Sequence, residues 1–199
     1  MSYQYRKMTP SEQADVVALR LRRGYPPHAP PHPFRQHGSY LLTAANYEHV
    51  PVMKSPDRRD EFQTRLHKGF RSIDVAVSGW VILPNHYHVL VMTDSLDRVS
   101  SFLKLLHGTT AREWNMADEM TGKRRVWYKF SDRWLREERH CLQALNYIHY
   151  NPLKHGYVNH PYLWVWSSLH WYHETKGRRW LRDNWKAYPA ADFGKGWDD

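Results

Sequence analysis

Two histidines separated by one residue, His86 and His88, lie in a run of apolar and β-branched residues that predicts a strand over 86–93. Side chains of a strand alternate between its two faces, so both imidazoles point to the same side of the sheet. Imidazoles spaced in this way can bind one divalent metal ion. The pair alone is a weak indication, because the chain has 14 histidines and polar residues also occur on open sheet faces.

A second group of reactive residues occurs on a predicted helix over 137–151. Tyr147 and Asn151 are four positions apart, so they lie one above the other on a single stripe of the helix, and the small Ala144 leaves space beside them. Tyr150 falls on nearly the opposite side from the stripe expected to face the core, which consists of Cys141, Leu142, Leu145 and Ile148. Without the histidine pair, we would interpret Tyr147 as an aromatic at the edge of the core and Asn151 as a helix cap.

A phenol, an amide oxygen and two imidazoles together suit the cleavage of a phosphodiester. The phosphodiester is anionic and repels nucleophiles, and a metal bound to a non-bridging oxygen withdraws that charge. A tyrosine with an ordinary pKa of about 10 is almost wholly protonated at neutral pH, and forming its phenolate costs roughly 4 kcal/mol. The metal or a nearby cation must lower this barrier, and Lys154 is the closest candidate along the chain.

Together these motifs resemble the HUH single-strand endonucleases. His86-Tyr87-His88 is similar to their His-hydrophobic-His motif, and Tyr147 to Asn151 is similar to the single-tyrosine helix of the insertion-sequence transposases in that superfamily. Three stretches resemble the REP-associated tyrosine transposases: GWVILPNHYHVLV over 79–91, YIHYNPLKHGYV over 147–158 and WVWSS over 164–168. The resemblance extends over roughly residues 38–170 and preserves the order of the elements.

The resemblance implies a metal-dependent DNA transposase or endonuclease in which Tyr147 is the nucleophile. His86, His88 and Asn151 would hold Mg²⁺ or Mn²⁺, and the substrate would be single-stranded or hairpin DNA. Attack at or near a hairpin would leave a 5′-phosphotyrosine and a free 3′-OH, and the covalent bond would conserve the phosphodiester energy for rejoining.

Asn151 stands where the mobile transposases of that superfamily usually have Gln. This fits the REP-associated branch and argues against self-mobilising transposition. The REP-associated branch implies a monomer. A dimer that exchanges its tyrosine helices is the alternative that the mobile relatives imply, and the long C-terminal tail of this chain could block it.

Composition and charge favour a nucleic-acid partner. The chain of 199 residues has 29 Lys and Arg against 20 Asp and Glu, a net charge of +9, and 15% aromatic residues. Cations bind phosphates and flat rings stack on bases, although solvated charge and an aromatic core would give the same composition. The residues expected to bind DNA are Arg124, Arg125, Trp127, Lys129 and Lys154.

The elements predicted around these motifs alternate as β-α-β-β-α-β and then a further helix. Strands are expected over 39–47, 73–83, 86–93 and 126–135. A helix beginning at Ser55 and Pro56 carries the apolar stripe Phe62, Leu66 and Phe70, and a second begins near Leu96. This order predicts an α+β fold with a ferredoxin-like antiparallel sheet, to which the tyrosine-bearing helix is added.

The chain divides into three predicted parts. Residues 1–37 form a basic arm with a helix over 9–23 and a Pro/His-rich tract over 26–33. Residues 38–160 form the HUH domain, and residues 161–199 form a Trp-rich extension expected to pack on it. The single cysteine, Cys141, permits no internal disulfide, and no apolar run approaches membrane-spanning length, which favours a cytoplasmic protein without membrane contact.

Two other functions compete with this interpretation. A histidine-triad hydrolase would need a third histidine at position 90, where Leu90 stands, and a two-histidine phosphoesterase would need Ser or Thr two positions after a histidine of the pair. A non-catalytic nucleic-acid-binding module on the same fold stays open. Such a module would not need Tyr147 and Asn151 four apart together with the histidine pair.

Overall fold

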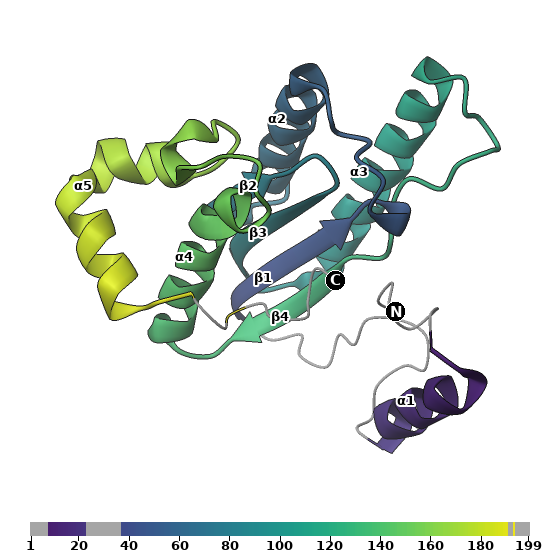
Figure 1. Ribbon diagram of the computed structural model, residues 1–199, viewed down its shortest axis with the longest axis horizontal. Helices are drawn as coiled ribbons and strands as arrows, with labels where there is room; N and C mark the ends of the chain where they lie inside the picture. The colour runs from purple at the N-terminus through teal and green to yellow at the C-terminus, as the bar shows by residue number, and fades with distance from the viewer. Residues whose placement is uncertain (1–7, 23–36, 191–192, 194–199) are drawn as a thin grey trace.

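The computed structural model describes residues 8–22, 37–190 and 193 (Figure 1), so the predicted Pro/His-rich tract lies outside the described residues. The strands are β1 (Gly38–Ala45), β2 (Ala76–Ile82), β3 (His86–Thr93) and β4 (Ser131–Leu135). The helices are α1 (Pro10–Arg22), α2 (Pro56–Ser72), α3 (Leu96–Ala117), α4 (Glu138–Lys154) and α5 (Leu169–Ala187), with short 3₁₀ turns η2 (Tyr47–His49) and η3 (Pro161–Leu163).

The four strands form one antiparallel sheet in the order β2-β3-β1-β4. β3 lies in the interior of the sheet, where Leu41 of β1 is opposite Leu90 and Ala45 is opposite His86. The predicted α+β class with an antiparallel sheet is confirmed. The order of the elements from β1 to α4 is also the one that the sequence predicted.

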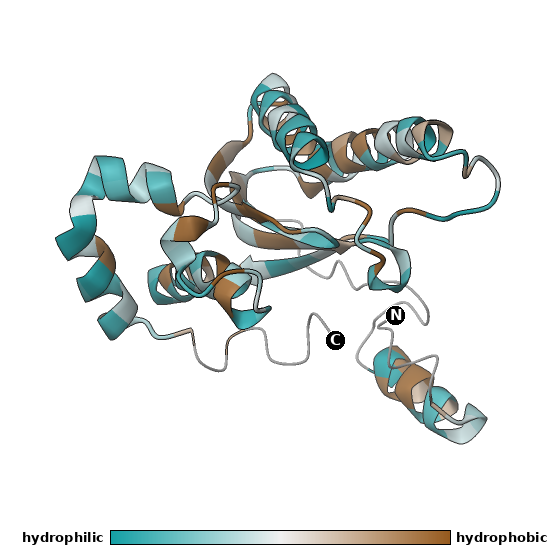
Figure 2. Ribbon diagram, turned by 45° about the horizontal axis from the view of Figure 1, so that its top comes forward, coloured by the Kyte–Doolittle hydropathy of each residue, from teal (hydrophilic) through white to brown (hydrophobic). Residues whose placement is uncertain are grey.

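Helices cover both faces of the sheet, α2 and α3 on one side and α4 on the other (Figure 2). The predicted stripe of α2, Phe62, Leu66 and Phe70, is fully buried in the larger core. α2 begins as expected, because the Ser55 hydroxyl accepts a hydrogen bond from the backbone N–H of Arg58. Leu145 and Ile148 of α4 form a smaller core with the opposite face of the sheet.

The prediction for the fourth strand is wrong in its first half. β4 contains only 131–135, whereas 126–130 lies outside the strand and makes an isolated bridge between Asn46 and Trp127. The apolar and aromatic residues that suggested a strand are there because Val126 and Trp127 pack into the core between the sheet, α2 and α3. β2 also begins three residues later than predicted, because α2 continues to Ser72.

α4 extends beyond the end predicted for it. Pro152 lies inside the helix, which continues to Lys154 before Gly156 adopts a left-handed conformation with φ 69°. A proline lacks the N–H that would bond four residues back, but it need not stop a helix that is close to its own end. The extra turn matters because it brings His155 next to the histidine pair.

The segment after α4 packs against the domain. Trp164 Nε1 donates a hydrogen bond to the carbonyl of Ile82, and the backbone N–H of Ile82 donates to the carbonyl of Trp166. Further along, α5 reaches α4 through Asn184, whose amide donates to Asn146 Oδ1 at 2.6 Å. α5 is kinked at Gly177, where φ is 83°. Within the described residues, no helix has the length and apolarity needed to cross a membrane.

The contact between α2 and α3 depends on a glycine, which gives a test of the core. A Cβ added at Gly69 would lie 1.9 Å from the Phe102 ring, whereas one added at Gly108 of α3 meets nothing within 4 Å. We expect Gly69→Ala to lower the free energy of unfolding by about 1–3 kcal/mol through overpacking. Gly108→Ala should raise it by about 0.5–1 kcal/mol, because Ala favours the helix.

Chemical denaturation of both variants measures the difference. Equal stabilities would show that α2 and α3 do not pack closely at Gly69.

Candidate active site

β3 and α4 bring the four predicted catalytic and metal-binding residues together. His86 Nε2 lies 3.2 Å from Asn151 Oδ1, and His88 Nε2 lies 3.4 Å from the Tyr147 hydroxyl. The two imidazole rings are 5.1 Å apart between centroids. All four side chains are at most 2% exposed. Both histidines therefore face α4, as the alternation of strand side chains requires.

Each histidine is held through its other ring nitrogen. His88 Nδ1 lies 2.7 Å from the Thr43 hydroxyl on β1, and His86 Nδ1 lies 2.8 Å from Asn85 Oδ1. An amide oxygen only accepts hydrogen bonds, so His86 Nδ1 donates to it, and in the neutral imidazole Nε2 then has a free lone pair. Metal-binding histidines are held in this way, with one nitrogen on a fixed polar partner and the other toward the ion.

The donor set fits a divalent cation. In the neutral form of His86 with its proton on Nδ1, Nε2 and Asn151 Oδ1 both offer lone pairs 3.2 Å apart, so one cation can bind both. Asn151 Nδ2 is buried and has no hydrogen-bond partner among the described residues, so hydrogen bonding by the amide nitrogen does not explain the burial of this side chain. The described residues contain no cluster of three His, Cys, Asp or Glu side chains, so a metal here would need the amide oxygen as a ligand.

Tyr147 is enclosed on several sides. Its ring is 5.1 Å from the His88 ring and 5.6 Å from the ring of Phe193, in the C-terminal tail. Lys154 Nζ lies 5.2 Å from the centroid of the Tyr147 ring, so the cation predicted from the sequence is close to the phenol. With 1% of the side chain exposed, the phenol meets a substrate only if a neighbouring group moves aside.

Of the residues expected to bind DNA, Trp127 is buried and Arg124 forms an ion pair. Trp127 is 6% exposed, stacks on His107 at 4.5 Å and donates to the Thr110 hydroxyl, so its ring is not available to a base. Arg124 Nη2 pairs with Asp118 at 2.7 Å. Hydrogen bonds from Arg58 and then from Arg124 lower the pKa of Asp118 to about 2.

Arg125 and Lys129 are exposed, and they border a cavity of about 530 Å³ between α3 and the 124–130 segment. Both side chains are thus placed where a DNA phosphate can reach them. They remain the predicted DNA contacts of this segment.

Two residues of the site were not predicted from the sequence. His155 lies with its ring 4.9 Å from that of His86, and Asn85 fixes the tautomer of the same histidine. His155 follows Asn151 by four positions, so the helical stripe would have included it if Pro152 had not been taken as the end of the helix. Asn85 was interpreted only as part of the turn before β3.

α4 also has a second buried face. His149 Nε2 lies 3.0 Å from Ser168 Oγ, and full burial lowers the pKa of His149 to about 3, so this imidazole is neutral at physiological pH. Asn146 donates to the carbonyl of Tyr188 at 2.7 Å. The tyrosine helix is therefore held from both sides, by the sheet and by the segment around α5.

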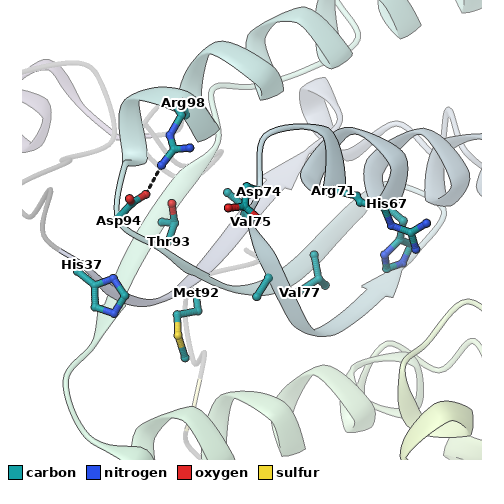
Figure 3. A pocket seen from close by; sticks show the side chains of 11 residues that line it. His37, His67, Arg71, Asp74, Val75, Val77, Met92, Thr93, Asp94 and Arg98 are labelled. Atoms are coloured by element: carbon teal, nitrogen blue, oxygen red, sulfur yellow. Dashed lines mark hydrogen bonds and ion pairs between the residues drawn. The ribbon is translucent and has the colours of Figure 1, made fainter.

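A separate cavity of about 500 Å³ lies at the far end of β3 (Figure 3). Met92 and Thr93 border it together with Arg71 and Arg98, and Arg98 pairs with Asp94. The histidine pair stands at the beginning of β3, and Met92 comes six residues after His86 and four after His88, so at about 3.3 Å per residue Met92 lies roughly 20 Å from His86 and roughly 13 Å from His88. The cavity is not part of the candidate active site.

The fold is similar to that of a solved structure described as "Structure of the REP associates tyrosine transposase bound to a REP hairpin". The TM-score is 0.57 at 20% sequence identity, and the match covers 72% of this chain and 84% of that one. The two chains therefore share a fold. No protein-family model matches the chain.

In sequence, the chain is similar to a Haemophilus influenzae protein named "Putative REP-associated tyrosine transposase". The two are 29% identical over 117 residues, which is 54% of this chain and 64% of that relative's length. The chain thus spans slightly less than two thirds of the relative that it matches. Similarity in sequence and in fold confirms the resemblance to the REP-associated tyrosine transposases that the motifs of β3 and α4 predicted.

Proposed function

We propose that this chain is a single-stranded DNA endonuclease and strand transferase of the REP-associated tyrosine transposase type. It cuts at or near DNA hairpins through a 5′-phosphotyrosine on Tyr147, with Mg²⁺ or Mn²⁺ held by His86, His88 and Asn151. The observation that carries the proposal is the approach of the Tyr147 hydroxyl and the Asn151 amide oxygen to the two Nε2 atoms of β3, at 3.4 and 3.2 Å.

In this mechanism the Tyr147 oxygen forms a bond to phosphorus and the bond from phosphorus to the 3′-oxygen breaks. The phenolic proton is finally carried by the new 3′-OH, and the reverse reaction rejoins the strand without another energy source. When bound, the metal ion withdraws charge from the phosphate. Lys154, 5.2 Å from the Tyr147 ring, stabilises negative charge that develops on the phenol oxygen.

The residues around Tyr147 position its oxygen and limit access of water. Thr43 on β1 holds the His88 ring through Nδ1, and the His88 ring packs edge-on against the Tyr147 ring at 5.1 Å between centroids, which positions the phenol.

A hairpin or single strand is the proposed substrate for two reasons. The structure that shares this fold is described as bound to a REP hairpin, and this chain has a net charge of +9 with exposed cations at Arg125 and Lys129. A non-catalytic nucleic-acid-binding module would use the same charges. It would not need a buried phenol beside the histidine pair.

A covalent adduct assay separates the two functions. Purified protein is incubated with a single-stranded oligonucleotide that contains a hairpin and is labelled at either end, and the products are resolved on a denaturing gel. The 3′-labelled fragment should stay attached to the protein, and the 5′-labelled fragment should be released with a free 3′-OH. Attachment of the 5′-labelled fragment would reverse the polarity of attack. Absence of any adduct, over a set of hairpin sequences that the protein binds, would favour the binding module.

Binding itself should be strongly dependent on salt. On a single strand each neutralised phosphate contributes about −0.7 to the slope of log K against log salt, so several contacts should give a slope of several units. Single-stranded and hairpin DNA should bind better than a plain duplex of the same length. Fluorescence anisotropy over a range of NaCl concentrations measures both effects. An affinity that does not change with salt would exclude binding through phosphates.

A further inference from the structure

A cluster of two aromatic rings and one guanidinium lies at the end of β1. The rings of Tyr47 and Tyr128 are 4.9 Å apart between centroids, and Arg125 Cζ lies 5.0 Å from the first ring and 5.8 Å from the second. Arg125 Nε donates to the carbonyl of Trp127 at 3.0 Å, which fixes the plane of the guanidinium. We call these three residues, Tyr47, Arg125 and Tyr128, the tyrosine–arginine platform.

The platform is next to the candidate active site. The N–H of Tyr128 donates to the carbonyl of Ala45 at 2.9 Å, and Ala45 is the residue of β1 opposite His86. Neighbouring strands are about 4.8 Å apart, so the backbone of Tyr128 lies roughly 10 Å from that of His86. A nucleotide beside the phosphate under attack can reach across this distance.

A second connection joins the platform to the histidine pair. The carbonyl of His49 accepts from Asn85 Nδ2 at 3.3 Å, and Asn85 Oδ1 is the partner of His86. The ring of His49 is 6.5 Å from that of Tyr128. The same residues therefore hold the platform and orient a predicted metal ligand.

The turn that carries Tyr47 is strained. Glu48 and His49 both have φ 55°, a left-handed conformation that disfavours residues other than glycine. Such strain costs about 1–3 kcal/mol per residue, and the same φ occurs at Asp74 and Glu119, so two such residues in succession distinguish this turn. Neither Tyr47 nor Tyr128 belongs to the two core clusters formed by the described residues, so packing of the core does not account for this platform.

We propose that the tyrosine–arginine platform binds an unpaired base of single-stranded DNA next to the scissile phosphate, an inference that rests on the proposed function. Two aromatic rings tilted by 37° to each other, with a fixed guanidinium over them, offer a ring face to a base and a positive charge to its phosphate. The bases of a duplex are already stacked on each other, so the platform selects an unpaired nucleotide. Stacking tolerates any base, and the platform therefore adds affinity rather than sequence preference.

The test compares two single-stranded probes that carry the same number of phosphates. One is a 12-mer of thymidine and the other is a 12-mer of abasic sites, so the salt-dependent contribution of the phosphates cancels between them. Stacking of one base is worth about 1–3 kcal/mol, which is about 5- to 150-fold in affinity. Wild-type protein should prefer the thymidine probe by at least this factor. In Tyr128→Ala, the preference for the thymidine probe over the abasic probe should fall by about 5- to 150-fold.

Matched variants separate stacking from folding. Tyr128→Phe keeps the ring and should keep the preference for the thymidine probe. Trp171→Ala removes an aromatic side chain on α5 that is 48% exposed, and this variant should also keep the preference. Arg125→Gln removes an exposed charge. It should weaken binding of the thymidine probe more than binding of the abasic probe, because the two rings also lose the cation that lies over them. Retention of the full preference in both Tyr128→Ala and Arg125→Gln would overturn the proposal.

A second arm tests the position of the base. In a hairpin oligonucleotide that wild-type protein cuts, single abasic sites are introduced one at a time, and binding to the Tyr147→Phe variant is measured. The loss of affinity caused by an abasic site should be concentrated at one or two nucleotides beside the cut. When Tyr128→Ala is added to the Tyr147→Phe variant, an abasic site at those nucleotides should no longer lower the affinity. An even or distant pattern would overturn the placement. Because the 12-mer comparison requires no cleavage, a chain that binds thymidine through the platform but forms no adduct would contradict only the proposed catalytic function.

Discussion

Tyr147→Phe is expected to abolish the covalent DNA adduct while DNA binding stays nearly unchanged. The substitution removes only the hydroxyl that lies 3.4 Å from His88 Nε2, and the remaining ring fills the same buried space. Loss of a nucleophile lowers a rate by about 10⁴-fold or more, so cleavage should fall below detection. The adduct gel and fluorescence anisotropy, run on the same preparation, give the two results.

Tyr150→Phe is the matched control on the same helix. Tyr150 is 48% exposed and lies on the other side of α4, so its variant should cut and bind like wild type. Cleavage that survives in Tyr147→Phe but disappears in Tyr150→Phe would assign the nucleophile to Tyr150. Loss of both adduct and binding in Tyr147→Phe would instead indicate that the hydroxyl supports the fold.

The sequence predicted those parts of the site that depend on local geometry. Alternation along β3 placed His86 and His88 on one face, and the spacing of Tyr147 and Asn151 placed them on one stripe of α4. Each pair lies within one element, where the rise and turn of the backbone determine which side chains are neighbours. The meeting of the two pairs was expected from the family resemblance as well as from these stripes.

Other features depended on contacts between distant segments, and the sequence did not reveal them. Asn146 and His149 are polar, so the pattern of α4 gave no reason to bury them; they are buried because α5 and Ser168 supply hydrogen-bond partners. Trp127 was taken for a DNA-binding residue because an aromatic between cations suits either a surface or a core. Its partners, His107 and Thr110, come from α3 and decide in favour of the core.

Removal of the metal should stop cleavage and leave most of the binding. Two neutral imidazoles and one neutral amide bind Mg²⁺ weakly, because that ion prefers carboxylate and phosphate oxygens. The DNA phosphate should therefore complete the site, so that metal and substrate bind cooperatively. EDTA should abolish the adduct, while the complex seen by anisotropy persists through the exposed cations. Mn²⁺ should restore cleavage at least as well as Mg²⁺, since it accepts imidazole nitrogen more readily.

His86→Ala should reproduce the effect of EDTA, because it removes one of the three proposed metal ligands. His173→Ala, which removes an exposed imidazole from α5, is the matched control and should behave like wild type. Titration of Mn²⁺ followed by electron paramagnetic resonance, with and without single-stranded DNA, reports the metal independently of cleavage. Wild type should bind Mn²⁺ more tightly when DNA is present, and His86→Ala should lose this gain. Full cleavage in excess chelator, or Mn²⁺ binding that His86→Ala leaves intact, would mean that His86, His88 and Asn151 serve the structure of the protein and that the phosphate is activated by Lys154 and other cations alone.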